Sequence, residues 1–286
     1  MIERISILGT GLLGTSVGLA LRAAGYKGSI TGWNRGAEQG QEALRMGAVD
    51  AVVADGVEAA RASEVTVLAV PIFATLDWME KLGPALTADQ LVTDVGSTKR
   101  VIAEAAARLF NAQGRAAFLP GHPMAGKERG GAALGDASLF RGAVWLFTDD
   151  AAAQRTAKAD ELVKCWRELV AAMGSKVIDL DAARHDELVA WVSHLPQFTA
   201  TALSALLEDE VGEAPELKDV GGRALREMTR LGASPYSMWR DIAHTNTEAV
   251  ERALLKLEQH LAHIRENLRT PGLRDEFERA NKFRRE

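Results

Sequence analysis

The sequence predicts an α/β protein in which a doubly wound, mostly parallel sheet is followed by an all-helical region. Two observations predict this fold class. Short apolar runs alternate with helical patterns from the N-terminus to about residue 180, which is typical of a parallel sheet covered by helices. After Asp181 no convincing strand remains. We therefore expect two domains, residues 1–181 and residues 182–286.

Residues 4–35 predict a complete strand–helix–strand unit. An apolar run that ends at Leu8 predicts a buried strand, an apolar helical pattern covers Val17–Ala24, and a second strand is expected over Ser29–Trp33. Glycines at G-x-G-x-x-G spacing separate the first strand from the helix: Gly9, Gly11 and Gly14. This context is the one that the dinucleotide fingerprint requires, so we expect a Rossmann-type domain.

Each glycine has an expected role. Gly9 permits the tight turn, Gly11 lets the backbone approach a pyrophosphate, and Gly14 lets helix and strand pack closely. The helix N-terminus supplies free N–H groups and a dipole that favour the pyrophosphate anion. The backbone expected to bind it is formed by Gly9, Gly11, Leu12, Leu13 and Gly14.

The residues after the second strand bear on the choice between NAD and NADP. An acidic residue at this place would bind a ribose hydroxyl and repel a 2′-phosphate. Asn34 stands there instead and carries no charge, and Arg35 follows it. An arginine pairs with a phosphate in fork geometry. We therefore expect NADP, with NAD as the alternative in which Arg35 is only a solvated side chain.

The remaining strands and helices of the first domain follow in regular alternation. Val70 and Pro71 end a predicted strand, and we expect them to face the cofactor because open α/β sheets bind ligands at the carboxyl ends of their strands. Further strands are expected at 49–53, 64–70, 90–95, 116–119, 142–148 and 176–180, and helices at 37–46, 73–82, 101–110 and 157–173.

The C-terminal region predicts long helices. One covers residues 182–207 and should be kinked at Pro196. The last begins at Thr247, and its apolar residues recur at 4-3-4-3-4 spacing: Val250, Leu254, Leu257, Leu261, Ile264 and Leu268. A narrow seam of this kind packs on one partner helix. Because a helical domain of this size has a thin core of its own, we expect a homodimer, with an intrachain partner as the alternative.

Composition excludes several classes of protein. A net charge of −5 gives no basic face for nucleic acid. The single cysteine, Cys165, excludes a disulfide framework and a cysteine-based metal site, and it suits a reducing cytoplasm. No apolar run approaches the length needed to span a membrane, and the chain enters a strand at once, so we expect no membrane segment, no signal peptide and no metal.

A dinucleotide-binding domain followed by a helical domain suggests hydride transfer from a substrate hydroxyl. Few polar residues are placed where they could assist that reaction. His122 is expected in an open loop past a strand end, where it suits general-base catalysis. Ser97 also follows a strand end, but it equally suits a helix cap. Arg240 could bind a carboxylate or simply pair with Asp241. Other histidines, among them His185, are expected on helix surfaces.

Taken together, these segments resemble the prephenate/arogenate dehydrogenase family of tyrosine biosynthesis. The resemblance covers nearly the whole chain in the family's order. Its motifs are the glycine loop, Thr93–Lys99, Gly121–Glu128 (GHPMAGKE), Ser193–Pro196 (SHLP), Gly221-Gly222 with Thr229-Arg230, and Met238–Ile242 (MWRDI). The motifs HPMAG-x-E, SHLP and MWRDI are specific, whereas the glycine fingerprint alone is not.

The resemblance implies an NAD(P)-dependent oxidative decarboxylation of prephenate to 4-hydroxyphenylpyruvate, with arogenate dehydrogenase or a dual-specificity cyclohexadienyl dehydrogenase as alternatives. It implies that His122 and Ser97 bind the C4 hydroxyl and that Arg240 holds a substrate carboxylate. It also implies a dimer through the helical domain. Further residues are implied near the substrate or at the mouth of its site: Ser193, His194, Gln197 and Glu128.

Two alternative functions remain open, and one position departs from the family's pattern. Many prephenate-using members have histidine where this chain has Gln197, which leaves prephenate and arogenate both open. Another 3-hydroxy acid dehydrogenase would rely on a catalytic lysine in the helical domain, and residues 181–250 contain only Lys218. A non-enzymatic NADP-binding protein would not need His122, Ser97 and Arg240 together.

Overall fold

The computed structural model describes residues 1–285, apart from the side chain of Lys218. The chain forms two compact units: Met1–Glu187 with Ala233–Thr245, and Leu188–Gly232 with Asn246–Glu286. The sequence predicts a single domain boundary after residue 181. In the structure, helix α11 (Tyr236–Thr245) returns to the unit that contains the sheet.

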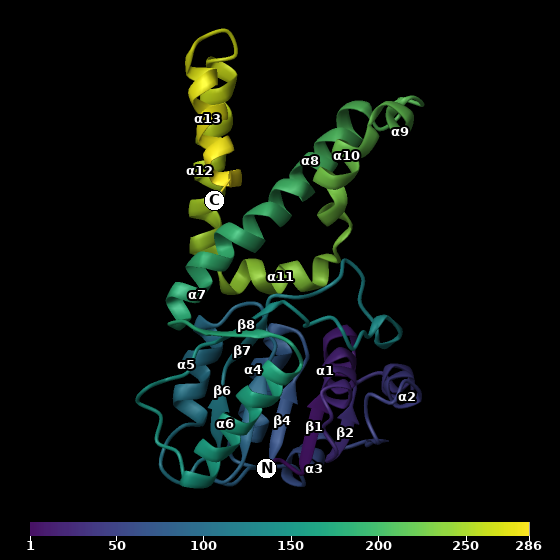
Figure 1. The fold of residues 1–286 in the computed structure, drawn as a ribbon, viewed down its shortest axis with the longest axis vertical. Coiled ribbons are helices and arrows are strands. Elements are labelled where there is room, and N and C mark those ends of the chain that lie inside the picture. Colours follow the sequence, from purple (N-terminus) through teal and green to yellow (C-terminus); the bar gives the residue numbers. More distant parts are fainter. Residues whose placement is uncertain (286) are drawn as a thin grey trace. The chain divides into compact units, whose positions relative to one another are not determined.

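The first unit is built on a six-stranded sheet, and the confirmed fold is a doubly wound α/β domain (Figure 1). The strand order is β3-β2-β1-β4-β5-β6, and every pair is parallel. The strands are β1 (Arg4–Leu8), β2 (Ser29–Trp33), β3 (Ala51–Val52), β4 (Val65–Leu68), β5 (Leu91–Asp94) and β6 (Ala117–Leu119). The helices are α1 (Leu12–Ala23), α2 (Ala37–Arg45), α3 (Gly56–Arg61), α4 (Ile72–Leu82), α5 (Arg100–Leu109) and α6 (Ala157–Ala172).

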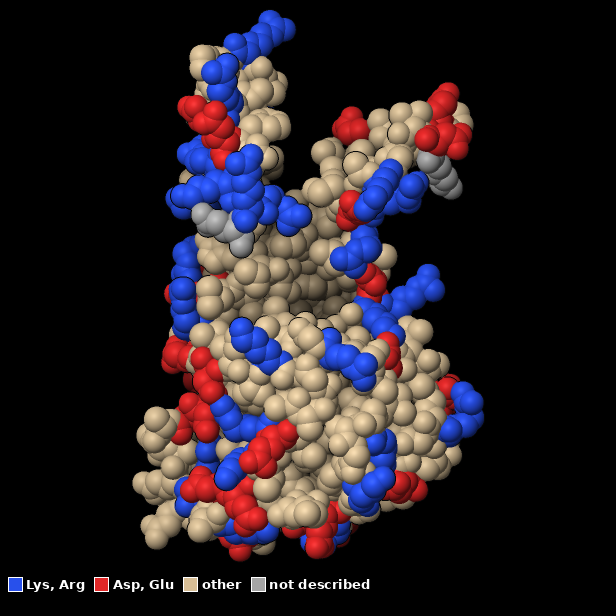
Figure 2. All heavy atoms as spheres, viewed as in Figure 1, with Lys and Arg blue, Asp and Glu red and all other residues tan. Residues whose placement is uncertain are grey.

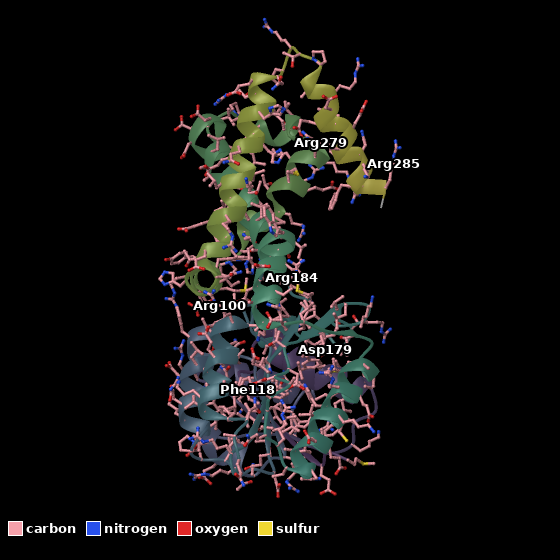
Figure 3. All side chains as sticks on the ribbon, turned by 90° about the vertical axis from the view of Figure 1, so that its left-hand side faces the viewer. Arg100, Phe118, Asp179, Arg184, Arg279 and Arg285 are labelled. Carbon is pink, nitrogen blue, oxygen red and sulfur yellow. The ribbon has the colours of Figure 1, made fainter. Side chains whose placement is uncertain are left out.

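Alternation along β1 separates two layers of core. Ile5 and Ile7 point to one face and pack with α1 and α6, where Trp166 is fully buried. Leu8 points to the other face, whose core includes α3, α4 and α5. Phe118 of β6 belongs to this second layer (Figure 3). A parallel sheet of this class is covered on both faces, and the central strands β4 and β5 are buried at every residue.

A second, three-stranded sheet holds β7 (Gly121–Pro123), β8 (Val144–Phe147) and β9 (Lys176–Asp179). β7 runs antiparallel to β8, and β8 runs parallel to β9. The prediction that His122 lies in a loop was therefore wrong, because it pairs with Leu146. A three-residue strand that ends in proline has no alternating pattern, so local sequence gave no signal for it.

The helical region begins with α7 (Ala182–Val189), passes through a π-helical turn (Ala190–His194) and continues as α8 (Leu195–Val211). Pro196 lies in the first turn of α8, where its missing N–H has no partner to lose. The irregularity predicted at Pro196 is thus a π turn directly before it. Shorter helices follow: α9 (Leu217–Val220), α10 (Gly222–Thr229) and a 3₁₀ turn (Arg230–Ala233).

Two helices end the chain, α12 (Thr247–Glu266) and α13 (Gly272–Arg285). The sequence predicts one long final helix, so α13 is an addition and Leu268 lies beyond the end of α12. Apolar side chains on this pair face solvent, among them Leu261, which is 56% exposed, and Phe283, which is 81% exposed. Lysine and arginine side chains gather along the same helices (Figure 2). Arg279 and Arg285 lie on α13 (Figure 3).

Among the described residues, every helix is too short or too polar to cross a membrane.

Candidate active site

The loop between β1 and α1 has the shape that the glycine fingerprint predicts. Gly9 has φ of +103°, and a Cβ there would lie 2.4 Å from the carbonyl oxygen of Ala69. A Cβ on Gly14 would lie 1.9 Å from the carbonyl oxygen of Gly9, so helix and strand touch at this point. A Cβ on Gly11 would meet nothing within 4 Å. Space therefore lies over Gly11, where a pyrophosphate is expected.

Helix α1 begins at Leu12, directly after this loop, and Leu13 follows in its first turn. No side chain caps the helix at Gly11, and the first turn holds no acidic residue. The first N–H groups of a helix have no partner within the helix, and they favour an anion. The loop and the helix start therefore fit a dinucleotide phosphate.

Asn34 joins the end of β2 to the glycine loop. Its Oδ1 accepts the N–H of Thr10 at 3.1 Å, and its Nδ2 donates to the carbonyl of Gly36 at 3.0 Å. Arg35 beside it is exposed, and within residues 1–285 it has no hydrogen bond or ion pair. No acidic side chain occupies the place that would repel a 2′-phosphate.

A cavity of about 270 Å³ lies at the carboxyl ends of β4 and β5. It brings together the start of α1, the predicted Val70 and Pro71, the predicted Ser97 and the helix α11. Its polar lining residues are Ser97, Lys127, Arg129, Ser237 and Asp241. Lys127 and Arg129 were not predicted as site residues, although Lys127 belongs to the GHPMAGKE motif and Arg129 directly follows it. Glu128 between them is half-buried and does not line the cavity.

A larger hollow of about 760 Å³ lies elsewhere in the same unit, at the carboxyl ends of β8 and β9. Four aspartates line it: Asp149, Asp150, Asp179 and Asp181. None of the predicted site residues reaches it. Within the described residues, no group of three or more histidine, cysteine or acidic side chains is placed to hold a metal ion.

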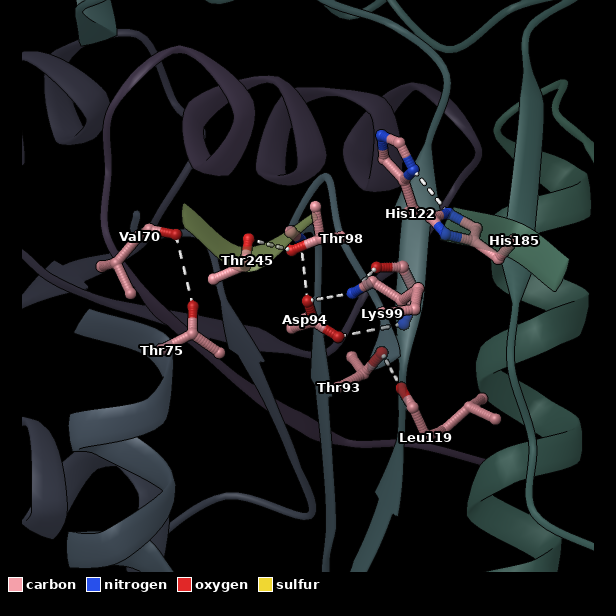
Figure 4. A network of polar contacts seen from close by, with 12 residues as sticks. Val70, Thr75, Thr93, Asp94, Thr98, Lys99, Leu119, His122, His185 and Thr245 are labelled. Carbon is pink, nitrogen blue, oxygen red and sulfur yellow. Dashed lines mark hydrogen bonds and ion pairs between the residues drawn. The ribbon is translucent and has the colours of Figure 1, made fainter. Parts of the chain in front are cut away.

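His122 is buried in β7, and its ring bonds to a second histidine (Figure 4). Nδ1 of His122 lies 2.8 Å from Nε2 of His185. The prediction that His185 is a surface residue was wrong, since its exposed fraction is 0%. Helical spacing did not indicate this, because the contact joins residues 63 positions apart. Ser97, which the family resemblance places with His122 at the C4 hydroxyl, makes no hydrogen bond to His122 among the described residues.

His185 is in turn bonded to an acidic neighbour. Its Nδ1 lies 2.8 Å from Oδ1 of Asp186. Burial lowers the pKa of His185 below its ordinary value, the bond to Asp186 opposes this, and the nearby charge of Lys99 lowers it further. The neutral ring is therefore the favoured form.

A buried ion pair fixes β7 to the loop that carries Ser97. Nζ of Lys99 contacts Oδ2 of Asp94 and donates to the carbonyl of Gly121 at 2.8 Å. Asp94 also accepts the N–H groups of Gly96, at 2.7 Å, and Gly121, at 3.0 Å. Burial lowers the pKa of Lys99, and Asp94 counteracts this. The network places His122, next to Gly121, on the strand beside the end of β5.

Arg240 and Asp241 lie on α11, whose Asp241 lines the cavity. Nε and one terminal nitrogen of Arg240 donate to the same oxygen of Asp241, at 2.9 and 2.7 Å. The other oxygen of Asp241 accepts the N–H of Phe73, at 3.4 Å, at the start of α4. The ion pair expected as the alternative role of Arg240 is present, and two of its five N–H donors are used in it.

The remaining candidates belong to the second unit and are described within it. His194 is buried, and its Nδ1 lies 3.3 Å from the side-chain amide of Asn246. Ser193 beside it is half-buried. Gln197 is also buried, and its Nε2 donates to the carbonyl of Leu231 at 2.7 Å. These residues follow one another through the π turn and the start of α8.

The parallel sheet, the glycine loop and the cavity at the strand ends define a dinucleotide-binding α/β protein. Comparison with known proteins narrows this class. The family models for the prephenate dehydrogenase nucleotide-binding domain and dimerization domain match residues 17–179 and 181–283. The chain belongs to the prephenate dehydrogenase family, a family of oxidoreductases.

Individual relatives agree with this assignment. Prephenate dehydrogenase of Lactococcus lactis subsp. cremoris is 32% identical over 92% of this chain and 70% of its own length. The structure of prephenate dehydrogenase from A. aeolicus, in complex with hydroxyphenyl propionate and NAD+, is 26% identical with a TM-score of 0.85, covering 100% of this chain and 98% of that one. Synechocystis arogenate dehydrogenase is 27% identical with a TM-score of 0.77, covering 98% of both chains.

Proposed function

We propose that this protein catalyses the NADP-dependent oxidative decarboxylation of prephenate to 4-hydroxyphenylpyruvate. The observation that carries the proposal is the cavity at the ends of β4 and β5, which joins the dinucleotide loop to Ser97 and α11. Family membership supports the reaction type. The nicotinamide, when bound, accepts hydride from C4 of the ring, and loss of the ring carboxylate as CO₂ makes the ring aromatic.

The chain's own residues supply proton transfer and charge. His122 takes the proton of the C4 hydroxyl, because a neutral imidazole is a base near neutral pH. Ser97, which lines the cavity, donates a hydrogen bond to the same hydroxyl. Arg240 holds a substrate carboxylate with the N–H donors that are not hydrogen-bonded to Asp241. Glu128 influences access to the site.

The glycine loop and the start of α1 hold the cofactor, and Arg35 selects its phosphate. The space over Gly11 accommodates the pyrophosphate. Val70 and Pro71 line the cavity beside it. The exposed guanidinium of Arg35 supports NADP, since a 2′-phosphate would find a cation and no carboxylate there. NAD is the alternative, in which Asn34 alone binds the ribose.

Arogenate is the second candidate substrate, and the similarity to Synechocystis arogenate dehydrogenase supports it. A carbonyl only accepts hydrogen bonds, so the atom of Gln197 that faces the carbonyl of Leu231 is the amide nitrogen. The same nitrogen donates to the hydroxyl of Thr201 at 3.2 Å. The Gln197 amide is neutral and can both donate and accept hydrogen bonds, so it is compatible with the keto-acid side chain of prephenate and with the amino-acid side chain of arogenate. In this proposal Ser193, His194 and Gln197 lie by the substrate side chain.

A homodimer is proposed through the helical region. The matching family model is described as a dimerization domain, and the apolar side chains that α12 and α13 expose support a partner. Leu261 and Leu268 of the predicted seam are 56% and 60% exposed, so within this chain the seam is only partly covered.

The test is a steady-state assay with prephenate or arogenate, each with NAD⁺ or NADP⁺, read as reduced-cofactor absorbance. We expect turnover with prephenate and NADP⁺, while turnover with arogenate alone would establish the second candidate. His122→Asn should abolish most turnover and keep cofactor binding, whereas Arg240→Gln should mainly raise KM. Absence of activity in all four combinations would contradict the proposed function.

A further inference from the structure

A buried chain of three side chains leads away from the proposed base. Asp186, His185 and His122 are joined by two contacts of 2.8 Å each (Figure 4). Their exposed fractions are 4%, 0% and 7%. Nothing in the proposed reaction uses His185 or Asp186, although burial of two adjacent polar side chains has a free-energy cost unless they are hydrogen-bonded. The two contacts offset this cost, and they also fix the orientation of the His122 ring.

The carboxylate of Asp186 is held by the N-terminus of α5. Its Oδ1 accepts the N–H of Lys99 at 2.7 Å, and its Oδ2 accepts the N–H of Arg100 at 3.0 Å. A helix N-terminus stabilises a negative charge, so Asp186 is an acceptor. Nδ1 of His185 must then carry the proton in the contact with Asp186.

This assignment determines the state of both rings. A neutral His185 has one ring proton, and with that proton on Nδ1 its Nε2 is an acceptor. Nδ1 of His122, 2.8 Å away, must therefore be the donor. Nε2 of His122 is left as the basic nitrogen, and it points away from His185 (Figure 4).

We propose that His185 and Asp186 are positioning residues for His122: they hold its ring as the Nδ1–H tautomer and stabilise the imidazolium that forms at Nε2. The proposal rests on the proposed function. When Nε2 of His122 takes the proton of the substrate hydroxyl, the hydrogen bond from Nδ1–H of His122 to His185 is kept and strengthens. The proton on Nδ1 is not transferred to His185. The charged groups that face His185 are Asp186 on α7, Asp94 at the end of β5 and Lys99 before α5.

The first test reads the tautomer and needs neither substrate nor cofactor. Nitrogen NMR of histidine-labelled protein at pH 8 should show Nδ1 of His122 protonated and Nε2 bare. In folded His185→Phe, which removes the acceptor, the population should shift toward the Nε2–H form. His260→Gln, an exposed position on α12, should leave the signals of His122 unchanged. An Nε2–H tautomer in the wild-type protein would overturn the proposal even if His185→Phe failed to fold.

The second test reads catalysis. His185→Phe should lower kcat by about tenfold or more with little change in KM, as expected when an orienting partner of a catalytic histidine is lost. The acidic limb of the kcat/KM profile should move to lower pH, because His122 loses its support as an imidazolium. His185→Gln, whose amide can accept from His122, should recover part of both effects.

The two tests separate the proposals from each other. The Nδ1–H tautomer in an enzyme inactive on all four substrate pairs would reject the proposed function and leave the geometry intact. An active His185→Phe enzyme with unchanged kcat and an unmoved pH limb would reject the positioning role alone. A merely structural role would lower stability without changing the tautomer or the limb.

Discussion

The hydroxyl groups of Thr98 and Thr245 lie 2.8 Å apart in the protein interior, although 147 positions separate them in the chain. Thr245 donates its one proton to the carbonyl of Asp241 at 2.8 Å, so it accepts from Thr98. Thr98 precedes α5 and Thr245 ends α11 (Figure 4). The bond fastens α11, with Asp241, beside the loop that carries Ser97.

Removing the hydroxyl of Thr245 should destabilise the fold more than removing that of Thr98, and removing both should cost less than the sum of the two single losses. Thr245→Val leaves the Thr98 hydroxyl buried without an acceptor, which costs about 1–3 kcal/mol. Thr98→Val costs less, because the proton of Thr245 keeps its own acceptor. In urea unfolding of single and double variants, the double variant should lose less free energy than the sum of the singles. Additive losses would mean that the two hydroxyls do not interact.

Features that depend on local sequence could be predicted, whereas features that depend on contacts between distant residues could not. The order of strands and helices in the sheet unit follows from local periodicity and from turn residues, and it was predicted nearly throughout. The burial of His185 depends on β7 at His122 and on the start of α5, which are distant in sequence. The packing of α11 onto the sheet unit involves contacts to Thr98 and Phe73, which are also distant in sequence. Helical spacing marks both segments only as amphipathic helices, so their surroundings could not be predicted.

Two glycines of the fingerprint should respond oppositely to alanine. Gly14→Ala places a methyl group 1.9 Å from the carbonyl of Gly9, so the helix must move, and we expect a loss of about 1–3 kcal/mol or more in unfolding free energy. Gly11→Ala meets nothing within 4 Å and should fold normally, but its methyl group enters the space expected for pyrophosphate. Calorimetric titration with NADP⁺ and thermal melts distinguish the two. Normal NADP⁺ affinity in Gly11→Ala would place the cofactor elsewhere.

Arg35 should decide the preference for the phosphorylated cofactor. A charge-assisted hydrogen bond to phosphate contributes about 1.5–3 kcal/mol, so Arg35→Ala should lower kcat/KM for NADP⁺ by about tenfold or more. The value for NAD⁺ should change little. Arg45→Ala, on the exposed side of α2, serves as the matched control. Equal effects on both cofactors would remove Arg35 from the phosphate site.

The ion pair of Asp94 and Lys99 should be sensitive to loss of either partner, because both side chains are fully buried. Lys99→Met leaves the carboxylate of Asp94 without its counter-charge, which costs about 3–5 kcal/mol. Asp94→Asn in the same chain should recover part of this loss. Arg45→Met, which removes an exposed pair with Glu42, should leave the midpoint of urea unfolding unchanged. A Lys99→Met variant as stable as this control would show that the pair contributes nothing.

His185 should make the fold sensitive to acid. Burial lowers its pKa below 6.5, so the unfolded chain binds a proton at a pH where the folded protein does not. This contribution to stability is present above pH 6.5 and is lost as the pH falls toward the lower pKa of the folded state, by at most about 1.4 kcal/mol per pH unit. His185→Gln cannot take up that proton. Its destabilisation relative to wild type, measured by urea unfolding, should therefore be largest at pH 7.5 and smaller at pH 5.5. A difference that stays constant or grows as the pH falls would show that the pKa of His185 is not lowered in the folded protein.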